Sequence, residues 1–139
     1  MSVLRRLARY HRYLLDERRR ALRTLEEQAA AIEGAIEGLD QGIVTEQRIA
    51  RSAPEVIGAY GGFARAALER RSVLLGSLSE ASDAVDAARD ELLDAFSEVK
   101  RYEISLEHQE RREHEERGRQ LQGQIDEAAL NLHRRRDRG

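Results

Sequence analysis

The sequence contains no cysteine, no tryptophan and a single proline, and aromatic residues make up only 4% of its 139 residues. Without cysteine the chain forms neither disulfides nor thiolate metal sites, which suits a reducing cytoplasm. No apolar run approaches the ~20 residues that span a bilayer, and the N-terminal residues lack the uninterrupted apolar core of a signal peptide. These absences predict a soluble, cytoplasmic protein and leave peripheral attachment to a membrane complex open.

Charge and helix-forming residues dominate what is present. Charged residues make up 36% of the chain, and alanine, glutamate, arginine and leucine prevail, as is typical of long helices or coiled coils. Between residues 4 and 23 there are eight arginines and two acids, between 77 and 98 seven acids and one arginine, and the tail HRRRDRG is basic. Both ends are therefore basic and the later middle is acidic, although the net charge is only −2.

Apolar residues in the first third of the chain recur at steps of three and four. Eleven of these fourteen positions are apolar: Leu4, Leu7, His11, Leu14, Arg18, Ala21, Leu25, Ala29, Ile32, Ile36, Leu39, Ile43, Glu46 and Ala50. Such a sustained heptad-like pattern requires a partner helix. It predicts a helix over about residues 3–50, weakened at Gly34, Gly38 and Gly42, which each cost ~1 kcal/mol relative to alanine.

The pattern stops at the segment SAPEV, which carries turn signals. Ser52 followed by Glu55 has the form of a capping box, and Pro54 lies in the first turn, where its missing N–H does little harm. These residues predict a hairpin bend within a helical break near residues 51–62. A second pattern with one jump follows: Tyr60, Phe63, Ala67, Leu74, Leu78, Ala81, Val85, Ala88, Leu92, Ala95 or Phe96, Val99, Tyr102 and Leu106.

The C-terminal third is less regular than the rest. Residues 107–120 contain no aliphatic side chain, which indicates a solvated stretch supported by charge pairs at i,i+4 spacing. An apolar stripe then returns at Leu121, Ile125, Ala128 and Leu132.

Two helix registers accommodate this pattern. In the first, Leu4 pairs with Leu132, residues 51–80 hold the bend and a short helical segment, and a long helix covers about residues 80–136. In the second, a single hairpin bent at Ser52 leaves the C-terminal third unpaired. We favour the first, because it buries the last apolar stripe and pairs the two polar zones. Both describe one all-α domain over residues 1–139, an antiparallel two-helix coiled-coil hairpin.

Residue patterns for catalysis are missing. The four histidines, His11, His108, His114 and His133, form no i,i+4 pair and no HExxH motif, and GAYGGF lacks the spacing of a phosphate loop. Carboxylates are plentiful, but extended helices offer no dry concave pocket in which a carboxylate pKa would shift. We therefore expect no enzyme, no cofactor and no metal site, with His11 a tolerated member of the apolar pattern.

The arginine-rich N-terminus permits two further interpretations. Arginines interleaved with Tyr10 and Tyr13 are able to bind phosphates and stack on bases, but a pI of about 6.1 is unlike the strongly basic footprint of nucleic-acid-binding domains. Leu4, Leu7 and Leu14 among arginines also have the form of a membrane-surface helix. We expect instead a coiled-coil strand with an arginine-rich outer face and no nucleic-acid partner.

Three features together resemble the FliJ family, small helical-hairpin proteins of the flagellar export apparatus related to YscO-type injectisome stalk proteins. The first is the patterned N-terminal helix of about fifty residues. The second is a break followed by the Y-x-x-F helix start in AYGGFARAALERR. The third is the run EVKRYEISLEHQERREHEERGRQLQGQIDEAAL, with its Lys-Arg-x-Glu entry, charged centre and Q-x-x-x-D-E-x-A ending. The resemblance covers nearly the whole chain.

The resemblance implies a hairpin similar to the coiled-coil stalk of the rotary ATPase gamma subunit, with a non-enzymatic role in type III protein export. Family members are thought to insert into the hexameric export ATPase, promote its assembly or activity, and link it to the export gate in the membrane. A role in cycling export chaperones is also ascribed to them. The implied partners are the export ATPase hexamer, the export gate membrane protein and export chaperones, at the cytoplasmic face of the inner membrane.

The resemblance also assigns residues to these contacts. The tip expected to enter the ATPase ring is built from both chain ends and consists of Leu4, Arg5, Arg6, Leu7, Ala128 and Leu132. The export-gate contact is expected at Tyr60, Phe63 and Ala67. Phe63 matches the family pattern, whereas Ala67 is smaller than the leucine-like residue expected there, so neighbouring Leu68 and Leu74 are alternatives.

The residues leave two other functions open. One is a generic structural coiled-coil homodimer whose apolar patterns pair between chains, and the other is an arginine-rich nucleic-acid-binding helical protein. A stable obligate dimer would count against the stalk, because a single copy is expected in the pore of a ring.

Overall fold

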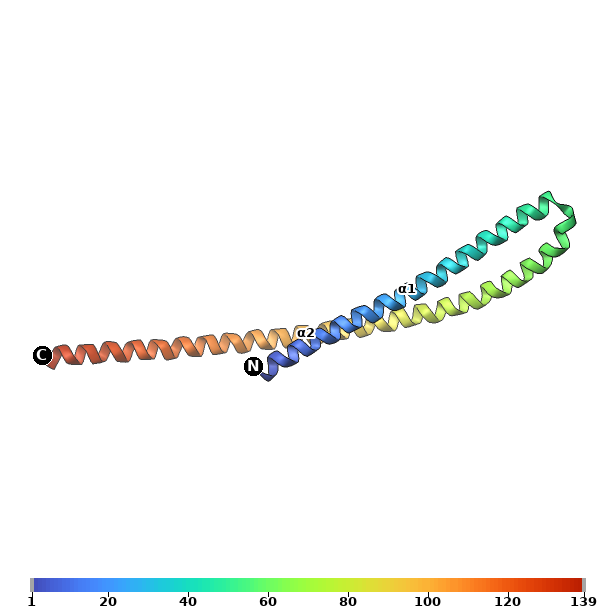
Figure 1. Ribbon diagram of the computed structural model, residues 1–139. Coiled ribbons are helices and arrows are strands. Elements are labelled where there is room, and N and C mark those ends of the chain that lie inside the picture. Colours follow the sequence, from blue (N-terminus) through green and yellow to red (C-terminus); the bar gives the residue numbers. More distant parts are fainter. Residues whose placement is uncertain (1, 139) are drawn as a thin grey trace. The chain divides into compact units, whose positions relative to one another are not determined.

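The structure, a computed structural model, describes residues 2–138 and is almost wholly helical. Helix α1 (Val3–Ser52) leads into the short 3-10 helix η1 (Pro54–Val56) and then into helix α2 (Ile57–Arg138) (Figure 1). α1 and α2 pack against each other in antiparallel directions, which confirms the predicted all-α two-helix hairpin.

The first helix begins at a capping residue. The backbone N–H of Arg5 donates a hydrogen bond to the Ser2 hydroxyl at 3.1 Å, so that one of the unpaired amides of the first turn is satisfied. α1 then runs unbroken through all three of its glycines. Its observed end at Ser52 lies two residues beyond the predicted range of 3–50.

The bend is shorter than expected and is not closed by a capping box. The Ser52 hydroxyl donates to the carbonyl oxygens of Arg48 and Ile49, both at 3.1 Å, and Ala53 precedes η1 without any side-chain cap. A serine in the last turn of a helix finds these carbonyls of its own helix nearby, and they compete with capping of the next one. Pro54 does lie in the first turn, as predicted. The break is confined to residues 53–56, and the following glycines belong to α2.

α1 buries one face at strictly alternating steps of four and three residues, the arrangement of a coiled-coil seam. All fourteen seam positions of α1 except Arg18 are buried or half-buried: Leu4, Ala8, His11, Leu15, Arg18, Leu22, Leu25, Ala29, Ile32, Ile36, Leu39, Ile43, Glu46 and Ala50.

 

The predicted pattern is confirmed from Leu25 onward. Before Leu25, positions Leu4, His11 and Arg18 are as predicted, but the other three are wrong by one residue. The chain has adjacent apolar pairs there, and the seam uses the second member of each: Ala8 in place of Leu7, Leu15 in place of Leu14 and Leu22 in place of Ala21.

α2 carries a matching seam without a gap. Its fifteen positions also alternate by four and three and are all buried or half-buried: Tyr60, Ala64, Ala67, Arg71, Leu74, Leu78, Ala81, Val85, Ala88, Leu92, Ala95, Val99, Tyr102, Leu106 and Gln109. The jump that the sequence pattern left between Ala67 and Leu74 is filled by Arg71. An arginine is tolerated at this seam position because it pairs with Asp40 of α1.

The favoured register, with Leu4 opposite Leu132, is wrong, and the single hairpin bent at Ser52 is the observed one. α1 has 50 residues, and the seam of α2 from Tyr60 to Gln109 has the same length. No separate segment ends near residue 80, because the four-three repeat continues through it and α2 is one helix of 82 residues. Residues 110–138 are consequently all exposed.

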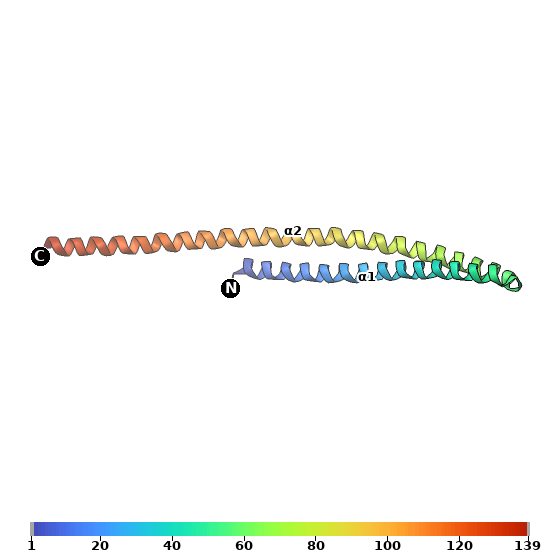
Figure 2. The same cartoon turned by 90° about the horizontal axis from the view of Figure 1, so that it is seen from above.

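Two compact units are distinguished along the hairpin, and α1 lies beside α2 in each of them (Figures 1 and 2). The bend unit comprises Leu14–Ala95. Its buried residues are Leu15, Ile36, Ala50, Ala67, Val85 and Ala88. Ion pairs join the helices at the edge of this core: Arg71 Nε donates to Asp40 Oδ1 at 2.7 Å, and Arg18 Nη1 donates to Glu91 Oε2 at 2.9 Å.

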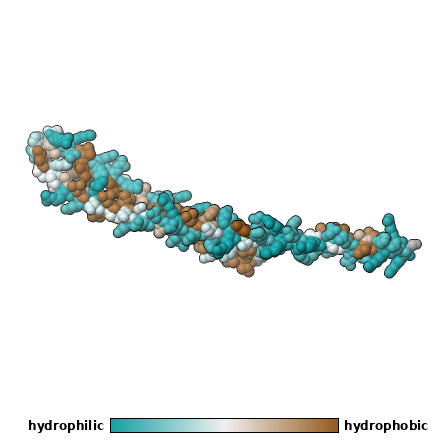
Figure 3. All heavy atoms as spheres, turned by 180° about the vertical axis from the view of Figure 1, so that it is seen from behind, coloured by the Kyte–Doolittle hydropathy of each residue, from teal (hydrophilic) through white to brown (hydrophobic). Residues whose placement is uncertain are grey.

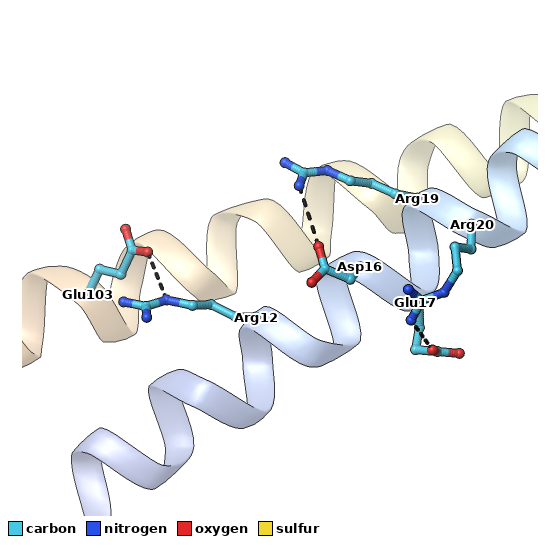
Figure 4. Close-up of polar contacts among 6 residues, drawn as sticks. All are labelled: Arg12, Asp16, Glu17, Arg19, Arg20 and Glu103. Carbon is cyan, nitrogen blue, oxygen red and sulfur yellow. Dashed lines mark hydrogen bonds and ion pairs between the residues drawn. The ribbon is translucent and has the colours of Figure 1, made fainter.

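The terminal unit comprises the residues up to Tyr13 and those from Phe96 on. Ala8 and Val99 form its core, and the ring of His11 stacks on that of Tyr102 with centroids 4.4 Å apart. Arg12 Nε reaches across to Glu103 Oε1 at 3.2 Å (Figure 4). His11 therefore fills a seam position by packing against an aromatic ring, as expected of a tolerated seam residue.

The seam predicts that two valines of α2 contribute differently to the free energy of unfolding. Val85 is 7% exposed and Val73 is 69% exposed. Val85→Ala should lower the free energy of unfolding by about 1.5 kcal/mol, because two buried methyl groups lose their contacts. Val73→Ala, the matched control, should change it by less than about 0.5 kcal/mol. Urea unfolding followed by circular dichroism measures both, and equal losses would contradict the observed seam.

Candidate functional site

The three residues expected at the export-gate contact lie just after the bend but differ in accessibility. Ala67 is 5% exposed and belongs to the seam. Tyr60 is half-buried and lines a small hollow with Ala50 and Pro54, so it packs over the end of the bend. Phe63 is 39% exposed. The structure thus keeps Phe63 as a surface residue, and the expectation that Ala67 offers a contact surface is wrong.

The exposure of these residues follows from their place on the α2 helix. Tyr60 and Ala67 occupy seam positions, whereas Phe63 lies beside the seam. Leu68, one residue beyond Ala67, is 61% exposed, and Leu74 is a half-buried seam residue. Of the two alternatives to Ala67, only Leu68 is therefore open to a partner.

The six residues expected to form one tip are not brought together. Leu4 is a half-buried seam residue, and Arg5 Nη2 donates to Glu110 Oε1 at 3.3 Å. Ala128 and Leu132 lie beyond Glu110 on the uncovered part of α2. Leu132 is 22 residues further along, which corresponds to about 33 Å of helix at ~1.5 Å per residue. Leu7 and Arg6 are exposed near the start of α1.

The uncovered part of α2, residues 110–138, begins with the polar stretch that the sequence predicted to be solvated. Arg111 pairs with Glu107 at 3.1 Å and Arg119 with Glu116 at 3.1 Å, at i,i+4 and i,i+3 spacing. Figure 3 shows a hydrophilic stretch here, with apolar side chains returning near the C-terminal end. The predicted solvated stretch with local charge pairs is confirmed.

The returning apolar stripe is not a continuation of the seam. Continuing the four-three repeat beyond Gln109 leads to positions 113, 116, 120, 123, 127 and 130, which include three glutamates and a glycine. The stripe at Leu121, Ile125, Ala128 and Leu132 keeps the same steps but is displaced by two residues, about 200° around an α-helix. It therefore faces away from the side that α1 covers in the terminal unit, and all four side chains are exposed.

Sequence reasoning missed a groove between the helices of the bend unit. The lining of one hollow includes Ile36, Glu37, Val44 and Leu75. The lining of a second includes Ala29, Ser82, Val85 and Asp86. Glu33 and Leu78 line both hollows, so the two form one groove. The available signal was charge: residues 24–47 and 72–88 hold nine acids and no lysine or arginine. The sequence shows this acidic stretch, but only helix pairing places it along a groove.

Metal and membrane sites were sought as well. Among residues 2–138, no cluster of three or more histidines and acids is placed to hold a metal ion. Neither helix, within the part that the structure describes, has a stretch long and apolar enough to cross a membrane. Comparison of the chain with protein-family models, curated proteins and solved structures found no match in any of the three.

α1 covers α2 only up to Gln109, which predicts that backbone amides in the covered and uncovered parts of α2 exchange hydrogen at different rates. Amides of residues 111–138 should exchange far faster than those of residues 74–102, because no tertiary contacts hold the uncovered helix against local opening. Amide exchange of the full chain, followed by mass spectrometry at low protein concentration, measures this. Equal protection of both segments would show that another segment covers the C-terminal part.

Proposed function

We propose that this chain is a non-enzymatic component of the flagellar type III protein export apparatus, a stalk that engages the hexameric export ATPase and links it to the export gate. The observation that supports this best is the antiparallel two-helix hairpin with its bend just before the Y-x-x-F motif. That architecture is the one implied by the resemblance to the FliJ family. A helix pair is only about 20 Å across, a section suited to the pore of a ring.

The proposed ring contact is the uncovered part of α2. Ala128 and Leu132 supply an exposed apolar surface, and Arg134, Arg135 and Arg136 follow directly. Positive charge at this end would steer the stalk toward an acidic collar on the ATPase. Because Arg5 is engaged with Glu110, the start of α1 would form a second contact further along the stalk.

The proposed gate contact is centred on Phe63. An exposed phenylalanine is a good anchor, since large aromatic side chains are enriched at interface cores. Export chaperones are proposed as further partners on the resemblance alone. The proposed location is the cytoplasmic face of the inner membrane, reached through the ATPase and the gate.

A structural coiled-coil homodimer is the second candidate function. The observation that favours it is the exposed stripe from Leu121 to Leu132, which lacks a covering helix in the part of the chain that the structure describes. Nucleic-acid binding receives less support. Arg12, Arg18 and Arg19 of the arginine-rich stretch each pair with a carboxylate, as Figure 4 shows for Arg12 and Arg19.

The ring contact is tested by adding the purified protein to the export ATPase. The wild-type chain should raise the hexamer fraction and ATP turnover. Leu132→Asp should lose most of this effect, because a charge replaces the apolar contact. Leu93→Asp is the matched control, since Leu93 is 64% and Leu132 63% exposed. Absence of any change in assembly or turnover with the wild-type chain would overturn the proposed function.

The gate contact is tested at the two phenylalanines of the chain. Phe63→Ala should weaken binding to the cytoplasmic part of the gate protein by about tenfold or more, as expected for an aromatic anchor. Phe96→Ala is the matched control, because Phe96 is 43% exposed and lies in the terminal unit. Binding is measured by titration, and helicity by circular dichroism. A large fall in thermal midpoint for Phe63→Ala would identify the ring as a packing residue instead.

A further inference from the structure

The groove of the bend unit has an apolar floor and a rim of net negative charge, on which five acids outnumber two arginines: Glu26, Glu33, Glu37, Asp40 and Asp86 against Arg48 and Arg89. Val85 and Ile36 are buried at its base, while Val44 and Leu75 remain 46% and 42% exposed within it. Glu33 and Glu37 lie along the α1 side of the groove. Within residues 2–138, neither carboxylate forms an ion pair with a lysine, arginine or histidine. Such a groove suits an amphipathic helix with basic flanks.

The uncovered end of α2 has the complementary properties. Residues 117–138 contain six arginines and three acids, a balance of +3, and they carry the exposed stripe from Leu121 to Leu132. A single helix of this length gains little stability without a packed face. The segment therefore has both an apolar face that lacks cover and a charge opposite to that of the groove.

The two surfaces also agree in length. The groove follows α1 from Glu26 to Arg48, which is about 33 Å at ~1.5 Å per residue, and residues 117–138 span about 32 Å. One wall of the groove and this segment belong to the same unbroken helix α2. Because a continuous helix cannot lie alongside itself, docking has to occur between two copies.

We propose that the C-terminal segment of one copy, residues 117–138, docks into the groove of the bend unit of a second copy. The stripe covers Val44 and Leu75, and the arginines at the end of the segment face Glu33 and Glu37. The contact is reversible and salt-sensitive, because its charge pairs lie at the surface. It does not depend on the proposed export function, but it covers the Leu132 surface that a ring would need.

Charge reversal in the full chain tests this docking. Sedimentation velocity should show mass rising above the monomer with concentration, and falling again as salt is raised. Arg135→Glu with Arg136→Glu, or Glu33→Arg with Glu37→Arg, should each weaken association by about tenfold or more. Combining all four substitutions should restore association, because the opposite charges are exchanged between the two surfaces.

A matched control carries the same charge change elsewhere. Glu55→Arg with Glu69→Arg alters two exposed acids outside the groove and should leave association nearly unchanged. Circular dichroism confirms that each variant keeps its helicity. A chain that stays monomeric at about 100 μM and low salt, where surface charge pairs are strongest, would overturn the proposal. So would association that survives both reversals, or that the four-fold variant fails to restore.

Discussion

The seam between α1 and α2 is the interaction on which the rest of the structure depends. Each helix contributes one face at four-three spacing, and the core between them is rich in alanine and only one layer deep. Stability is therefore spread over many small contacts. Arg71, at a seam position, is accommodated by its ion pair with Asp40, and a pair with both side chains this exposed contributes little to stability.

The difference in length between the helices creates the surfaces available to partners. α1 has 50 residues and α2 has 82, so the hairpin covers α2 only up to Gln109. The remaining residues keep an apolar stripe on a different face. The same C-terminal segment serves both the proposed ring contact and the proposed docking between copies. A segment that is bound in the groove of a second copy is not free to enter a ring. Self-association would therefore compete with binding to the ATPase.

Charge organises the surface in a similar way. Several N-terminal arginines are engaged by carboxylates of α2, such as Arg12 with Glu103 and Arg18 with Glu91. Residues 24–47 contain six acids and no lysine or arginine, and four of these acids border the groove: Glu26, Glu33, Glu37 and Asp40. The sequence contains both charge groups, but which acids meet arginines depends on the register of the two helices.

The sequence by itself determined the two helices, the bend near Ser52 and most of the seam, because heptad spacing and a lone proline act over a few residues. It also identified the solvated stretch, whereas the exposure of Phe63 was left open by a pattern that counted it among the apolar positions. Only the tertiary structure decided the register, since the alternative pairing of Leu4 with Leu132 satisfied the same apolar pattern. The deciding reason is physical: the four-three repeat of α2 runs without interruption through Arg71. α1 therefore packs against an equal length of α2, from Tyr60 to Gln109, and the C-terminal part of α2 stays uncovered.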